Sequence, residues 1–234
     1  MDIILVPGLW LEGASWDRVV PHLSAAGHRI AAITPPGHDG EDPSGVTYAD
    51  LVATIVNEID HASGPAVVVG HSAHCAAAWA AADRRMERVA AVVLVGGFPI
   101  PDGSPILDGL EPQDGVLPFV GWEPFAGDDT ADLDDRARAE LEGHMSPAPG
   151  AYVTGPQELH DERRYDLPVH VVCPEYTEAD LKAWVDGGAP HLSEFGKLHN
   201  VHYVDLNSGH WPQWSRPEDL AAAILEACSP IKLA

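Results

Sequence analysis

A serine in the setting of a nucleophile lies in the segment VVVGHSAHCAAAW, residues 67–79. An apolar run ends at Gly70, Ser72 follows two residues later, and an alanine-rich stretch begins directly after it. A serine hydroxyl attacks a carbonyl carbon only when a base accepts its proton and hydrogen-bond donors stabilise the oxyanion. A tight turn between a buried strand and a helix exposes such a hydroxyl and aims the next backbone N–H at the developing charge. We therefore predict that Ser72 is a nucleophile; the alternative is a serine that only caps the following helix.

The segment departs from the G-x-S-x-G pattern of a nucleophile elbow at its fifth position, where His74 replaces the second glycine. Glycine at that position lets the helix pack closely on the strand, so an imidazole must either loosen this packing or point outward. We expect His74 to be a packing residue, and the alternative is a polar group that reaches the pocket.

The position of the histidines along the chain selects a base for Ser72. In enzymes with this elbow the order is serine, acid, histidine, and the histidine follows the last strand. The segment VHYVDLNSGHWPQW places His210 in a glycine-containing loop after a strand pattern, so we predict that His210 is the general base. His170 lies inside a strand pattern and is expected in the core or at a sheet edge, and His38 lies in a loop rich in turn formers.

Two backbone amides are candidates for the oxyanion hole. The first strand pattern ends in VPGLW, and a chain reversal there can aim the N–H of Leu9 at the pocket. The N–H of Ala73, the residue after the nucleophile, is its expected partner. The alternative for this segment is an ordinary glycine turn.

The elements that must position these residues alternate regularly along the chain. Several strand patterns are apolar on both faces, which is typical of strands buried between two layers of helices. Strand–helix alternation of this kind predicts a mostly parallel sheet in a single α/β domain over residues 1–234. The predicted strands are 2–8, 29–36, 66–70, 89–97, 167–173 and 201–206, and the predicted helices are 16–26, 48–63, 73–86, 178–186 and 218–228.

The segment 98–160 differs from the rest of the chain. It is rich in Pro, Gly and Asp, and its clearest helical pattern covers only 128–144. Connections this long in a compact domain are usually functional or disordered. Because apolar side chains are spread through the segment, we expect a lid over the carboxyl edge of the sheet; these side chains are Phe98, Ile106, Leu110, Leu117, Phe119, Trp122 and Phe125.

Composition excludes several classes of protein. With 36 acidic and 13 basic residues the formal net charge is −23, which argues against binding to nucleic acid or to anionic lipid. Three cysteines without C-x-x-C spacing indicate neither a disulfide framework nor a zinc site. We recognise no signal peptide in the sequence, and we find no apolar run long enough to span a bilayer. We therefore expect a soluble cytoplasmic protein. The sequence does not decide whether the chain forms a homodimer.

The segments LVPGLWLEGASWDRVVPHLSAAGHRI, VVVGHSAHCAA and GHWPQWSRPEDLA resemble the α/β-hydrolase superfamily. The first is similar to the branch that contains plant methylesterases, salicylic-acid-binding protein and hydroxynitrile lyases. The resemblance covers the chain outside 98–160. It implies an α/β-hydrolase fold and a carboxylesterase that cleaves a small ester through an acyl-enzyme on Ser72. It implies no metal and no organic cofactor. The aromatic residues of the segment 98–160, with Trp10 and Trp211, suggest that the ester is apolar or aromatic.

The acid of the triad has two candidates, because relatives place an aspartate where this chain reads CPEYTEADL. Glu175 has the charge needed to orient His210, and we favour it. Asp102, after the preceding predicted strand, is the alternative. Glu178 and Asp180 are expected to begin the next helix, where acidic residues are favourable.

Two other functions remain compatible with these residues. One is a hydroxynitrile-lyase-like or C–C-cleaving enzyme, in which His74 would be the polar group near the carbonyl. The other is a non-catalytic homologue that binds a small molecule in the same pocket.

Overall fold

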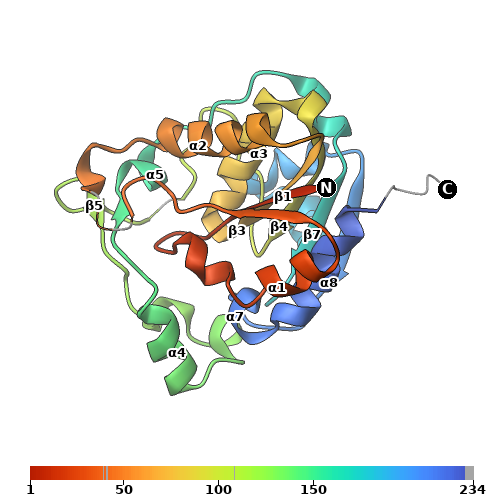
Figure 1. The fold of residues 1–234 in the computed structure, drawn as a ribbon. Coiled ribbons are helices and arrows are strands. Elements are labelled where there is room, and N and C mark those ends of the chain that lie inside the picture. The colour runs from red at the N-terminus through yellow and green to blue at the C-terminus, as the bar shows by residue number, and fades with distance from the viewer. Residues whose placement is uncertain (39, 41, 108, 230–234) are drawn as a thin grey trace.

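A computed structural model describes residues 1–38, 40, 42–107 and 109–229 of the chain. Its centre is a six-stranded parallel sheet with the order β2-β1-β3-β4-β7-β8 (Figure 1). The strands are β1 (Asp2–Val6), β2 (Arg29–Ala32), β3 (Ala66–His71), β4 (Val89–Val95), β7 (Val169–Cys173) and β8 (Val201–Asp205). Since all strands are parallel, their carboxyl ends meet at one edge of the sheet, and the loops that follow β3, β7 and β8 are brought together there.

The sheet divides the core into two layers. Every residue of β1, β3 and β7 is buried. Successive side chains of a strand point to opposite faces, and in β1 the side chain of Ile4 joins one core cluster while that of Ile3 joins the other. The continuous apolar strand patterns therefore have the cause expected from the sequence, which is burial on both faces.

Helices cover both faces of the sheet (Figure 1). One face carries α2 (Tyr48–His61) and α3 (Cys75–Arg84), and the other carries α1 (Val20–Ala25) and α8 (Pro217–Ala227). α6 (Glu178–Asp186) packs through Leu181 on the same side as α2. The helix starts follow local rules, because α2 and α6 each begin with a capping box in which a threonine and an aspartate satisfy each other's backbone N–H groups. The predicted fold class is confirmed.

Several predicted bounds differ from the observed ones. The strands predicted over 2–8 and 29–36 end early, at Val6 and Ala32, before their prolines. The helix predicted over 16–26 is a 3-10 turn, Gly13–Trp16, followed by the short α1. The helix predicted over 73–86 also begins as a 3-10 turn, Ser72–His74, before α3. The sequence pattern thus predicts whether an element is a helix or a strand better than it predicts the residues at which the element begins and ends.

The segment 98–160, here called the insertion, contains short elements joined by loops. They are the antiparallel pair β5 (Val116–Leu117) and β6 (Ala148–Pro149), and the helices α4 (Asp135–Glu142) and α5 (Ala151–Thr154). The helix predicted over 128–144 is wrong in its first half, because Asp134 caps α4 by accepting a hydrogen bond from the Ala137 N–H.

The insertion is anchored to the body of the protein by a separate apolar cluster. Leu133 and Leu141 of the insertion pack with Leu11, Trp211 and Trp214, which places α4 beside α7 (Pro212–Ser215) in Figure 1. Of the helices in the described residues, none combines the length and the apolar character needed to cross a bilayer.

Candidate active site

Ser72 lies at the turn between β3 and α3. Its φ of 55° is in the left-handed region, which is unfavourable for a side chain with a β-carbon and is a mark of functional turns. Gly70 permits the turn, because a β-carbon there would lie 2.8 Å from the Cα of Cys75 at the start of α3. The sequence pattern thus folds into the strand-to-helix elbow that exposes a nucleophile.

His210 and Glu175 extend from Ser72 in a chain of hydrogen bonds. The Oγ of Ser72 lies 2.8 Å from Nε2 of His210, and Nδ1 of His210 lies 2.8 Å from Oε1 of Glu175. Nδ1 faces a carboxylate and therefore carries the proton, which leaves Nε2 free to accept one from the serine. Both side chains are mostly buried, with 13% of His210 and 14% of Glu175 exposed. Such an arrangement can deprotonate a hydroxyl and hold the resulting imidazolium.

The structure does not bring the alternative acid to His210. Asp102 instead accepts a hydrogen bond of 2.9 Å from the Leu159 N–H, within the insertion. Asp180 belongs to the capping box of α6, and Glu178 pairs with Lys182 on the same helix. Glu175 reaches His210 because β7 and β8 are neighbours in the sheet, so the loops after them lie together.

The two predicted oxyanion donors line the same cavity as Ser72. Among the described residues, no acceptor contacts the Leu9 N–H. Ala73 is in the first turn of its helix, where N–H groups have no acceptor within the helix. In the described part of the chain, neither N–H group therefore has an acceptor, and both residues line the cavity.

His74, the residue in place of the elbow glycine, points away from the cavity. Its Nδ1 donates a hydrogen bond of 2.7 Å to the Pro7 carbonyl oxygen, and its ring meets the edge of the Tyr152 ring at 5.4 Å. Burial lowers the pKa of His74 to about 4, so the imidazole is neutral at neutral pH. The side chain lies in the packing beneath the turn, where it ties the start of α3 to the loop that carries Leu9.

His71, between Gly70 and Ser72, was not singled out by the sequence. Its Nε2 donates to the backbone oxygen of His210 at 2.8 Å, and its Nδ1 lies 3.3 Å from Nε2 of Gln213. Complete burial, and after it the neighbouring His210, lower the pKa of His71 to about 3. A neutral imidazole thus holds the loop that carries His210 against the elbow. The feature of the sequence that could have pointed to His71 is its position between the glycine and the serine of the G-x-S pattern.

Asp129 of the insertion was also missed. One of its carboxylate oxygens, one of Glu175 and a ring nitrogen of His210 lie within 4.8 Å of one another. Burial raises the pKa of Asp129. Both ring nitrogens of His210 are engaged, by Ser72 and by Glu175, so we assign no metal ligands to this group. No spacing pattern marks Asp129 among the many aspartates around it.

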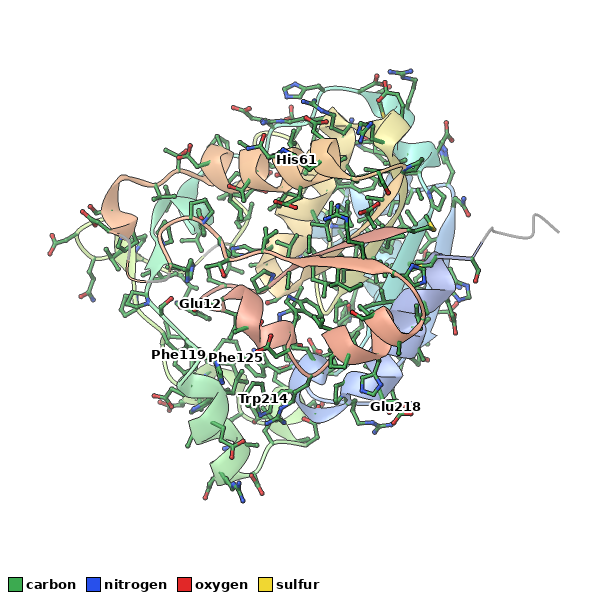
Figure 2. All side chains as sticks on the ribbon, in the orientation of Figure 1. Glu12, His61, Phe119, Phe125, Trp214 and Glu218 are labelled. Carbon is green, nitrogen blue, oxygen red and sulfur yellow. The ribbon has the colours of Figure 1, made fainter. Side chains whose placement is uncertain are left out.

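A cavity of about 720 Å³ opens above Ser72 and His210. Phe125 of the insertion stacks at 6.5 Å over the His210 ring, and Phe119 lies beside Phe125 (Figure 2). In the described part of the chain, no Lys, Arg, Asp or Glu side chain lines this cavity. Most of its wall is apolar and comes from the insertion, including Ile100, Ile106, Leu107, Leu110, Val120 and Phe125.

Pyrethroid hydrolases are among the known proteins to which the chain is similar. A pyrethroid hydrolase from Sphingobium wenxiniae is 34% identical over 74 residues, which are 30% of this chain and 26% of that enzyme. The crystal structure of a pyrethroid hydrolase from Sphingobium faniae superposes with a TM-score of 0.73 at 24% identity and covers 98% of both chains.

Plant methylesterases and their bacterial counterparts have the same fold. An extracellular α/β-hydrolase from a Paenibacillus species, described as homologous in structure and function to a tobacco salicylic acid binding protein, gives a TM-score of 0.79 at 15% identity. That superposition covers 97% of this chain and 98% of the other. An Arabidopsis methylesterase gives a TM-score of 0.76 at 14% identity, with the same coverage. The profile of the alpha/beta hydrolase family matches residues 3–223. The chain belongs to the alpha/beta hydrolase family.

Proposed function

We propose that this protein is a serine carboxylesterase that hydrolyses an uncharged apolar or aromatic ester through an acyl-enzyme. The observation that carries the proposal is the pair of 2.8 Å contacts that join Ser72 to His210 and His210 to Glu175, at the floor of the cavity. A hydroxyl, an imidazole and a carboxylate in this order form the arrangement that activates a serine in acyl transfer.

In the first half of the reaction, His210 Nε2 accepts the proton of Ser72 while the serine Oγ bonds to the ester carbonyl carbon. The N–H groups of Leu9 and Ala73 donate to the oxyanion, and Glu175 stabilises the imidazolium through Nδ1–H. The carbon–oxygen bond to the alcohol then breaks, and His210 returns the proton to the leaving alcohol. The acyl group stays on Ser72 as an ester.

In the second half, a water molecule takes the place of the alcohol. His210 accepts a proton from this water as its oxygen attacks the acyl carbon, and the same two amides bind the second oxyanion. Collapse of the intermediate returns the proton to Ser72 Oγ and releases the carboxylic acid. One ester and one water give one acid and one alcohol.

The cavity supports the proposed substrate class. Its volume of about 720 Å³ lies within the range of roughly 300–1,000 Å³ typical of sites for drug-sized ligands. An apolar wall stabilises apolar groups on both sides of a carbonyl and disfavours a charged substrate, since a charge loses its hydration there. The relatives named pyrethroid hydrolases agree with an ester substrate.

The test is hydrolysis of p-nitrophenyl esters by the full chain. The wild type is expected to release a burst of p-nitrophenol and to react with a fluorophosphonate probe, and Ser72→Ala is expected to lose labelling and about 10³–10⁶-fold of kcat/KM. Ser104 is a matched control, because it also lines the cavity and has no place in the proposed mechanism. Full activity in Ser72→Ala, or labelling lost in Ser104→Ala, would contradict the proposal.

A further inference from the structure

A second carboxylate, that of Asp129, lies beside the chain formed by Ser72, His210 and Glu175. As described above, its oxygen is within 4.8 Å of both a Glu175 oxygen and a ring nitrogen of His210. Asp129 is half-buried on the 3-10 turn Asp128–Thr130 of the insertion. The general base therefore faces one acidic residue from a strand end and another from the segment that walls the cavity.

The backbone holds this turn against the loop of the general base. The His210 N–H donates to the carbonyl oxygen of Asp129 at 2.8 Å, and the Gly209 N–H donates to Oδ2 of Asp132 at 2.8 Å. A β-carbon on Gly209 would lie 2.5 Å from that Asp129 oxygen, so only glycine allows the approach. Two hydrogen bonds thus hold the backbone of the segment that carries Asp129 against the loop of His210.

The charges that face Asp129 come from three directions. His210 on the loop after β8 favours its ionised form, whereas Glu175 on the loop after β7 and Asp128 on the same turn oppose it. Burial is the largest influence and raises the pKa of Asp129. Asp132, which binds Gly209, is a further carboxylate on this segment. Because Glu175 and Asp128 oppose the ionised form of Asp129, a positive charge on His210 is the favourable partner of the Asp129 carboxylate.

Glu175 does not use its full capacity for hydrogen bonds. Its Oε1 accepts from His210, while its Oε2 is buried and, among the described residues, has no hydrogen-bond partner. A single contact therefore fixes Glu175 on the imidazole. A second negative group at this distance adds to the electrostatic stabilisation of the imidazolium without another contact to it.

We propose that Asp129 is a second acidic positioning residue, whose carboxylate stabilises the imidazolium of His210 and partly substitutes for Glu175 when Glu175 is removed. The inference rests on the proposed function, because the imidazolium forms only if Ser72 gives its proton to His210. It also makes the insertion part of the electrostatics of the site, in addition to the wall of the cavity.

The first test compares Asp129→Asn with the wild type in two measurements. Asparagine keeps the shape of the side chain and the backbone bond to His210, so only the charge is lost. We expect the acid limbs of two pH profiles, that of kcat/KM and that of the rate of fluorophosphonate labelling, to move to lower pH by about 0.5–1 unit.

The matched control is Asp128→Asn, which removes the same charge from the neighbouring exposed residue. It is expected to shift both acid limbs by less than half as much. Unchanged acid limbs in Asp129→Asn, or an equal shift in both variants, would overturn the inference. Fluorophosphonate labelling of wild-type Ser72 separates the two proposals. Labelling without a shift in Asp129→Asn contradicts only the role of Asp129, whereas absence of labelling in the wild type contradicts the esterase.

A second test asks whether Asp129 substitutes for Glu175. In the wild-type background, Asp129→Asn is expected to lower kcat/KM by about 3–10-fold. In the Glu175→Gln background, the same substitution is expected to lower kcat/KM by about 30-fold or more, because the effects of two residues that share a role are not additive. If Asp129→Asn lowers kcat/KM by the same factor in both backgrounds, the two residues act independently, and the proposal that Asp129 partly takes over the role of Glu175 is wrong.

Discussion

The two sides of the cavity are built in different ways. On the strand-end side, Ser72, Glu175 and His210 follow β3, β7 and β8, which belong to one hydrogen-bonded sheet. On the insertion side, the wall comes from loops and short elements, of which the longest helix is α4 with 8 residues. A rigid sheet fixes reactive atoms to within a hydrogen bond, whereas loops vary in shape at little cost to the core.

With the proposed function, this difference predicts that reaction and selectivity depend on separate parts of the chain. Changes at strand ends should affect all esters alike, because the hydroxyl, imidazole and carboxylate meet only the carbonyl group. Changes in the insertion should depend on the ester, because its side chains meet the groups attached to the carbonyl. Asp129 is the exception, since it belongs to the insertion by sequence and to the strand ends by its contacts.

The largest effect is expected from the acid. If Glu175 is the acid of the proposed triad, Glu175→Gln should lower kcat/KM for every ester by about 10²–10⁴-fold, because His210 loses the carboxylate that orients it and pairs with its imidazolium. Asp102→Asn should change kcat/KM less than about threefold, since an asparagine oxygen still accepts from the Leu159 N–H. Steady-state kinetics with p-nitrophenyl acetate and a longer ester measure both. A larger loss in Asp102→Asn than in Glu175→Gln would reverse the assignment of the acid.

A smaller effect that depends on the ester is expected from the cavity wall. Ile106→Ala removes a buried insertion side chain from the cavity, so KM for p-nitrophenyl octanoate should rise by about 10-fold while that for the acetate changes less than twofold. Ile33→Ala is the matched control, because Ile33 is similarly buried but does not line the cavity. The proposed separation fails if both esters respond equally to Ile106→Ala, or if Ile33→Ala gives the same selectivity change.

The strand-end side could be predicted in large part from the sequence. Ser72 follows a motif whose local geometry is fixed by a strand, a turn and a helix, and chain order selects His210 among thirteen histidines. The choice between Glu175 and Asp102 depends on where each side chain points, which no periodicity encodes. The contacts of Glu175 to His210 and of Asp102 to Leu159 favour Glu175.

For the insertion, the sequence predicted the bounds of the segment but not the arrangement of the elements within it. Its apolar residues have neither the helical nor the strand period over a useful length, so the pattern indicates burial without geometry. His71 and Asp129 were missed for a related reason. Each acts through a contact to His210, which is far away in sequence, and tertiary contacts of single residues leave no spacing signal.

The last prediction concerns stability and tests whether the strand-end side depends on neutral buried histidines. In the unfolded chain a histidine has a pKa of about 6.5. In the folded protein, burial lowers the pKa of His74 to about 4 and that of His71 to about 3. Between these values the unfolded state binds more protons, so the free energy of unfolding should fall as the pH is lowered from 6.5 to 4, by about 1–3 kcal/mol for each histidine.

Urea unfolding at several pH values measures this slope, and His74→Asn isolates one contribution. An asparagine amide can still donate to the Pro7 carbonyl but does not titrate, so the variant should lose part of the pH dependence while it is less stable at pH 7 because a smaller side chain leaves a cavity. His22→Asn, at an exposed position of α1, controls for the loss of a histidine as such. If His74→Asn keeps the full slope, the imidazole under the elbow is not held neutral by burial, and the rigidity of the strand-end side has another source.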